Sequence, residues 1–127
     1  MASNTDDRVK ETLGRIQREE LKGDLAQHIQ HVAELAPEMF QSYTEWREAV
    51  LKDGALARKI KLLITVGIMT VLRADDALTL YSRIARNAGS SREELLEAMA
   101  VGALFSGGPG LVAMANAIRN IEREVKL

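Results

Sequence analysis

Residues 56–89 read LARKIKLLITVGIMTVLRADDALTLYSRIARNAG, and this stretch decides the fold. Its first half is almost continuously apolar from Ile60 to Leu72. Its second half repeats apolar residues at the spacing of one helix face, namely Ala74, Ala77, Leu78, Tyr81, Ile84, Ala85 and Ala88. The pattern predicts two helices separated by a short break at residues 73–76. A chemical site, if the chain carries one, is expected where these two helices meet.

Three further helices are predicted before this pair. The first is amphipathic, spans about residues 5–21 and stops at Lys22-Gly23. Asp24 can cap the second helix, and Pro37 suits the first turn of the third, which runs to about Leu51. The third helix places five large apolar residues on one side: Met39, Phe40, Tyr43, Trp46 and Val50. For Phe40, Tyr43 and Trp46 a core role is the simplest interpretation, and the alternative is that they wall a pocket.

Two helices are predicted after the central pair. Ser91 and Glu94 have the spacing of a capping box, so one helix begins there. The sequence Gly107-Gly108-Pro109-Gly110 forces a tight junction before a last helix over residues 111–125. No stretch shows the alternation of a strand. We therefore expect an all-α protein with six or seven helices in a single domain over residues 1–127, including an N-terminal helical extension over residues 1–23.

Composition excludes several classes of function. Lys and Arg number 17 against 18 Asp and Glu, without a basic stripe interleaved with aromatic residues, so no nucleic-acid partner is expected. The absence of cysteine removes disulfides, thiolate metal sites and cysteine nucleophiles. The N-terminal MASNTDDRVKETLG lacks the apolar core of a signal peptide, and the longest apolar run, about 13 residues, is shorter than the roughly 20 that span a bilayer. We expect a soluble, cytoplasmic protein without a membrane partner.

Two regions carry more apolar surface than a small bundle can cover. Residues 60–72 and 98–117 are apolar on more than one helix face. Such helices are buried, either at the centre of the monomer or against other subunits. We expect the second arrangement, a stable homo-oligomer.

Several segments, taken in order, resemble the carboxymuconolactone decarboxylase and alkylhydroperoxidase D superfamily. They are residues 56–64 with the helix to Leu72, the helix end at Asn87-Ala88-Gly89, the capped start over residues 91–95 and the junction over residues 105–109. The resemblance covers about residues 37–120. It implies an all-helical alkylhydroperoxidase D-like fold that assembles as an obligate oligomer, either a trimer or a hexamer.

The peroxidase branch of this superfamily uses a Cys-x-x-Cys pair, a His four residues after the second Cys, and a Glu on the preceding helix. Counted back from Gly89, these positions fall on Ala74, Ala77, Tyr81 and Leu62. All four are replaced, so a thiol–disulfide cycle is not expected. The decarboxylase branch also lacks the Cys pair, and residues 63–66 and 86–89 look closer to it, although that branch usually keeps the His.

Tyr81 is the first candidate for a catalytic residue. A phenol donates a proton or hydrogen bond but, with a usual pKa of about 10, it is a poor base. The alternative is a core tyrosine whose hydroxyl reaches a backbone carbonyl. Arg73, in the break, is the candidate contact for a ligand carboxylate. The candidate substrate-binding wall comprises Leu62, Ala74, Ala77 and Trp46.

Two functions from different classes stay open. The first is a cofactor-independent decarboxylase, a carbon–carbon lyase, acting on a small carboxylated lactone in aromatic-compound catabolism. The second is a catalytically inactive family member that serves as a ligand-binding or scaffold oligomer. Neither a metal nor a cofactor is expected, because His28 and His31 share a helix face but no third ligand is indicated.

Overall fold

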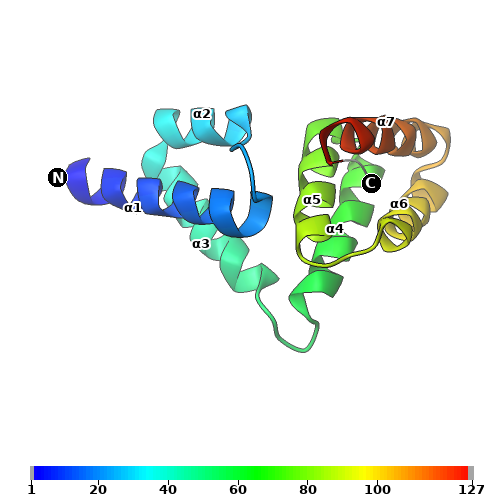
Figure 1. Cartoon of the computed structure of the whole chain (residues 1–127), viewed down its shortest axis with the longest axis horizontal. Helices are drawn as coiled ribbons and strands as arrows, with labels where there is room; N and C mark the ends of the chain where they lie inside the picture. Colours follow the sequence, from blue (N-terminus) through cyan, green and yellow to red (C-terminus); the bar gives the residue numbers. More distant parts are fainter. Residues whose placement is uncertain (1, 126–127) are drawn as a thin grey trace. The chain divides into compact units, whose positions relative to one another are not determined.

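The computed structural model describes residues 2–125, with side chains described for residues 5–123. Within this range the chain is all-α, as predicted, and contains no strand. The elements are α1 (Ala2–Arg15), the π-helical η1 (Ile16–Leu21), α2 (Gln27–Leu35), α3 (Pro37–Leu51), α4 (Arg58–Leu72), α5 (Asp75–Asn87), α6 (Arg92–Ser106) and α7 (Gly108–Val125) (Figure 1). No helix among the described residues is long and apolar enough to cross a membrane.

The chain divides into two compact units, residues 1–52 and residues 53–127. The first contains α1, η1, α2 and α3, and the second contains α4 to α7. The boundary follows α3, at the Asp53-Gly54 turn that the sequence predicts as a helix end. The single domain over residues 1–127, with residues 1–23 as an extension, stays a prediction.

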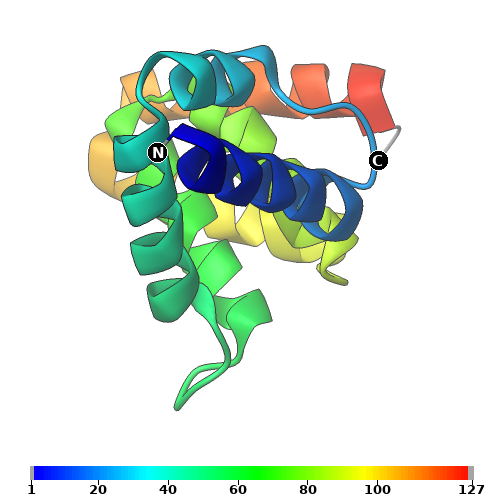
Figure 2. The same ribbon diagram turned by 90° about the vertical axis from the view of Figure 1, so that its left-hand side faces the viewer.

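In the first unit, α1 and α2 both pack on α3 (Figure 2). Phe40 and Thr44 of α3 are buried, whereas Met39, Tyr43, Trp46 and Val50 are each more than half exposed. The core interpretation is therefore confirmed for Phe40 and wrong for Tyr43 and Trp46. Residues 39, 43, 46 and 50 follow one another at helical spacing and form an apolar face of α3 that lies away from its buried one.

In the second unit, α4 contacts α5, α6 and α7. The core is made of fully or almost fully buried side chains from all four helices: Leu62, Val66, Leu78, Leu95, Met99, Ala117 and Ile121. Helices α4 and α6 approach closely because a glycine stands on each side. A Cβ at Gly102 would lie 2.5 Å from the carbonyl oxygen of Gly67, and a Cβ at Gly67 would lie 3.3 Å from the carbonyl oxygen of Ala98.

The predicted capping box of α6 is confirmed. The Glu94 backbone N–H donates to Ser91 Oγ at 3.0 Å, and the Ser91 backbone N–H donates to a Glu94 carboxylate oxygen at 2.9 Å. Lys59 of α4 also lies 3.0 Å from this carboxylate. The Ser91 backbone hydrogen bond and the Lys59 ammonium together lower the pKa of Glu94 from its usual value. The carboxylate is therefore ionised at neutral pH, and its contribution to stability is lost only as pH falls below the usual carboxyl range.

Two helix starts differ from the prediction. Helix α2 begins at Gln27 rather than directly after Asp24, because the Ala26 carbonyl accepts its first backbone hydrogen bonds. Helix α7 begins at Gly108 rather than Leu111, since the Gly107 carbonyl accepts from the N–H groups of Gly110 and Leu111. The Gly-Pro-Gly sequence thus lies inside the first turn, where proline loses no helical hydrogen bond.

Candidate functional site

The predicted break between the central helices is a tight helix-ending turn. The Arg73 N–H donates to the Thr70 carbonyl and the Ala74 N–H donates to the Met69 carbonyl, both at 3.1 Å. This is the pattern of a Schellman motif, whose turn residue normally is glycine because its φ is positive. Arg73 holds that position with φ 55°, and its side chain is exposed. A non-glycine residue in this conformation is strained, and such strain is typical of functional positions.

Helix α5 turns one face toward the interior of the second unit. Its buried residues are Leu78, Ser82, Ile84 and Ala85. Ala74, Ala77 and Tyr81 form a half-buried stripe, which runs at helical spacing between Leu78 and Ala85 on one side and Ile84 on the other. The predicted apolar stripe is therefore confirmed except at Ala88, which is exposed, and Ser82 is a further buried residue that the stripe did not include.

The structure separates the predicted site residues into three environments. One group follows the α4–α5 turn and the half-buried stripe of α5: Arg73, Ala74, Ala77 and Tyr81. Leu62 is 0% exposed inside the second unit, so it is a core residue in this chain. Trp46 belongs to the first unit, is 68% exposed and contacts Tyr43 edge-to-face, with ring centroids 6.5 Å apart. The catalytic and binding roles of all these residues stay predictions.

Comparison with known proteins assigns the chain to a family. The model of the carboxymuconolactone decarboxylase family matches residues 37–120, which are 84 of the 127 residues. The chain belongs to this family. The match begins at α3 and ends within α7, so it includes the α4–α5 turn and the half-buried stripe of α5.

Relatives of the chain carry the same fold. A carboxymuconolactone decarboxylase candidate from Burkholderia xenovorans LB400 is 27% identical, with a TM-score of 0.74 over 94% of this chain and 95% of that one. A carboxymuconolactone decarboxylase family protein from Legionella pneumophila, solved in its apo form, is 24% identical, with a TM-score of 0.69 over 92% of this chain and 96% of that one. An uncharacterised protein of Cupriavidus necator is 27% identical over 82 residues, 65% of this chain and 73% of that protein.

This member of the carboxymuconolactone decarboxylase family has polar atoms in its interior that sequence reasoning missed. Ser82 and Ser90 are 0% exposed, and neither hydroxyl has a hydrogen-bond partner among the described residues. Ser82 is separated from Leu78 by four residues and from Ala85 by three, so it was detectable as a member of the buried stripe. Near Ser90, Arg86 donates to the Ser90 backbone carbonyl at 2.9 Å.

A groove of about 310 Å³ lies in the first unit of this family member, between α1, α2 and the start of α3. Its lining residues include none of the predicted site residues; they are Asp6, Val9, Lys10, Leu13, Gln30, Ala33, Glu34 and Pro37. Among the described residues, no cluster of three or more His, Asp or Glu side chains is arranged to hold a metal ion. His28 and His31 are both exposed on α2.

Proposed function

We propose that this family member is a cofactor-independent decarboxylase of a small carboxylated lactone, of the kind found in aromatic-compound catabolism. The observation that carries the proposal is the half-buried stripe of α5, where Tyr81 and two alanines follow an arginine held at φ 55°. Membership of the carboxymuconolactone decarboxylase family supports this class of chemistry. Because the chain contains no cysteine, a thiol peroxidase cycle is excluded for it.

The proposed reaction needs one proton donor and one anion contact. When the carbon–carbon bond to the carboxylate breaks, CO₂ departs and its bonding electron pair stays on the ring carbon, where an adjacent carbonyl can delocalise it. The Tyr81 hydroxyl donates a proton to that carbon and regains one from water. Arg73 orients a ligand carboxylate, since a guanidinium binds a carboxylate bidentately. Ala74 and Ala77 leave room for the ring, while wall roles for Leu62 and Trp46 remain predictions.

Replacing Tyr81 by phenylalanine is expected to lower kcat for decarboxylation of a carboxylated lactone by about 10²- to 10⁴-fold, the usual contribution of a positioned proton donor. CO₂ release and loss of lactone absorbance across a panel of such substrates measure this effect. Tyr43→Phe is the matched control, because Tyr43 is the other tyrosine and is more than half exposed on α3. Turnover that survives in Tyr81→Phe would exclude Tyr81 as the donor.

Arg73→Gly separates binding from folding in the same assay. Glycine adopts the required positive φ without strain, so the variant is expected to fold at least as stably as the natural chain. Its KM for a carboxylated substrate is nevertheless expected to rise about tenfold or more, because a charged hydrogen bond is lost. An unchanged KM would remove Arg73 from the proposal.

The alternative is a catalytically inactive ligand-binding or scaffold protein. Tyr81 stands where the family usually has His, and the three other peroxidase positions are replaced as well. These replacements favour the inactive alternative. A natural chain that binds carboxylated lactones without releasing CO₂ from any of them would establish this alternative.

We also propose that the chain forms a homo-oligomer, a trimer or a hexamer, in the cytoplasm. Large apolar side chains are exposed on α3, on α4 and around the α6–α7 junction, where Leu104 and Phe105 are 75% and 79% exposed. Contiguous patches of this kind on a soluble chain are typical of protein interfaces. Light scattering is expected to give three or six times the 14.0 kDa of one chain. A mass of 14 kDa at micromolar concentration would contradict the oligomer.

A further inference from the structure

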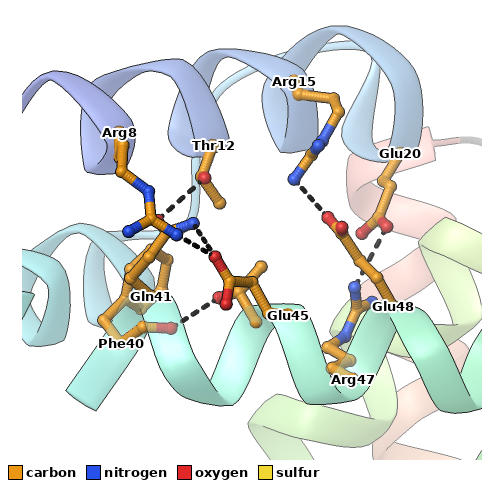
Figure 3. Close-up of polar contacts among 10 residues, drawn as sticks. Arg8, Thr12, Arg15, Glu20, Phe40, Gln41, Glu45, Arg47 and Glu48 are labelled. Atoms are coloured by element: carbon orange, nitrogen blue, oxygen red, sulfur yellow. Dashed lines mark hydrogen bonds and ion pairs between the residues drawn. The ribbon is translucent and has the colours of Figure 1, made fainter. Parts of the chain in front are cut away.

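Helix α1 and η1 are attached to α3 mainly through polar contacts (Figure 3). We call residues 2–21 the strap. Each contact joins a strap residue to an α3 residue; the pairs are Arg8–Glu45, Thr12–Gln41, Arg15–Glu48 and Glu20–Arg47. Thr12 donates to Gln41 Oε1 at 2.9 Å, and Arg47 donates to Glu20 Oε1 at 3.0 Å. The strap contributes the positive charge to the first two ion pairs, through Arg8 and Arg15, and the negative charge to the third, through Glu20.

The apolar part of this attachment is small. The strap buries Val9, Ile16 and Leu21, and α3 contributes Phe40. Ile16 and Leu21 are five residues apart, which fits the i to i+5 repeat of the π-helix they begin and end. Two threonines, Thr12 and Thr44, take the remaining buried positions. The second unit, by contrast, is held by a core of leucine, valine, methionine and isoleucine.

Two of the three ion pairs are accessible to solvent ions. The side chains of Arg8 and Glu45 are 60% and 53% exposed, and those of Arg15 and Glu48 are 39% and 35% exposed. A hydrogen bond from Gln41, followed by the charge of Arg8, lowers the pKa of Glu45, so this carboxylate is charged at neutral pH. Exposed pairs are screened when the Debye length falls from about 10 Å at 0.1 M salt to about 3 Å at 1 M. Only the Glu20–Arg47 pair is shielded, at 13% and 11% exposure.

The strap ends at a natural pivot. Lys22 has φ 50°, a conformation that non-glycine residues rarely adopt, and Gly23 follows it. Residues 22–26 are not helical, and α2 then packs on α3 by itself. Movement about Lys22-Gly23 would therefore displace the strap without requiring α2 or α3 to unfold.

From these contacts we infer that high salt releases the strap from α3. The released strap moves as a unit about Lys22-Gly23 and exposes the α3 face that carries Phe40 and Thr44. A neighbouring face of α3, which carries Met39, Tyr43, Trp46 and Val50, is already exposed and apolar, so release widens the exposed surface of α3 while α2 stays packed on it. The inference concerns a conformational device in the first unit and does not depend on the proposed chemistry.

Hydrogen–deuterium exchange of the full chain in 0.1 M and 1 M NaCl tests the release. Exchange of backbone amides in residues 5–21 is expected to rise about threefold to tenfold at 1 M NaCl, because screening weakens the two exposed pairs. Exchange in residues 38–51 and 58–106 is expected to change by less than about twofold. Unchanged exchange in the strap, or an equal rise in strap and α3, would overturn the inference.

A charge exchange gives a second, independent readout. Arg15→Glu and Glu48→Arg are each expected to release the strap at 0.1 M salt, because like charges then face each other. Combining R15E with E48R is expected to restore protection, which excludes simple misfolding as the cause. Arg92→Ala is the matched control, since it removes the exposed Arg92–Glu122 pair of the second unit. Failure of the double variant to restore protection, or release by the control, would contradict the strap.

Discussion

Replacing Gly102 by alanine is expected to lower the free energy of unfolding by about 2–3 kcal/mol, the cost of overpacking a close contact. The added methyl would lie 2.5 Å from the Gly67 carbonyl oxygen and 2.9 Å from Thr70 Cβ. The first of these atoms is backbone, so α4 and α6 have to move apart. Alanine is the better helix former by about 1 kcal/mol, and a net loss would therefore show that the helix contact outweighs helix propensity.

A graded series of alanine substitutions sharpens this measurement. A Cβ at Gly67 would meet its nearest atom at 3.3 Å, and one at Gly54 would meet its nearest atom, the end of the flexible Lys61 side chain, at 3.6 Å. Chemical denaturation should rank the losses as Gly102→Ala, then Gly67→Ala, with Gly54→Ala close to neutral. If Gly102→Ala proves as stable as Gly54→Ala, the close approach of α4 and α6 is wrong.

Leu62→Ala is expected to lower the free energy of unfolding by about 3 kcal/mol, within the range for fully buried leucines. Leu62 is 0% exposed, so truncation leaves a cavity that its neighbours fill only in part. Leu35→Ala is the matched control: Leu35 is 72% exposed on α2, outside the helices proposed to form the oligomer, and its truncation should change the free energy of unfolding by less than about 0.5 kcal/mol.

The Leu62 measurement also decides between two interpretations of one residue. As the family position of a catalytic Glu, Leu62 was predicted to line a substrate pocket. As a core residue, its truncation reduces stability and leaves KM for a lactone unchanged. A stable Leu62→Ala variant with a raised KM would restore the pocket interpretation.

Local signals in the sequence located most helices. Pro37 began α3, the Ser91–Glu94 pair began α6, and Asp75 and Asp76 lie in the first turn of α5, where the helix dipole favours negative charge. These signals act between residues a few positions apart, so a single sequence contains them completely. The family resemblance over residues 37–120 was likewise confirmed, because it depended on the order and spacing of such segments.

Which side of each helix is buried could not be predicted from the sequence with the same success. On α5, Tyr81 and Ser82 are neighbours, and the covered side depends on how α4 and α7 pack against it. On α3, three aromatic residues suggested a core face, yet contacts with the distant α1 fixed Phe40 and Thr44 as the buried side. The positive φ of Arg73 could not be predicted from the sequence either, because glycine is the usual residue in that turn.

The start of the family match inside the first unit has a practical consequence. The match begins at Pro37, but α3 packs on α1 and α2, which precede it. A shortened chain trimmed to the family limits would keep α3 while removing every partner of Glu45, Arg47 and Glu48 in the strap. The start of the family match and the boundary between the two units therefore fall at different residues, and chimaeras with other family members should exchange segments at residues 52–57 rather than at Pro37.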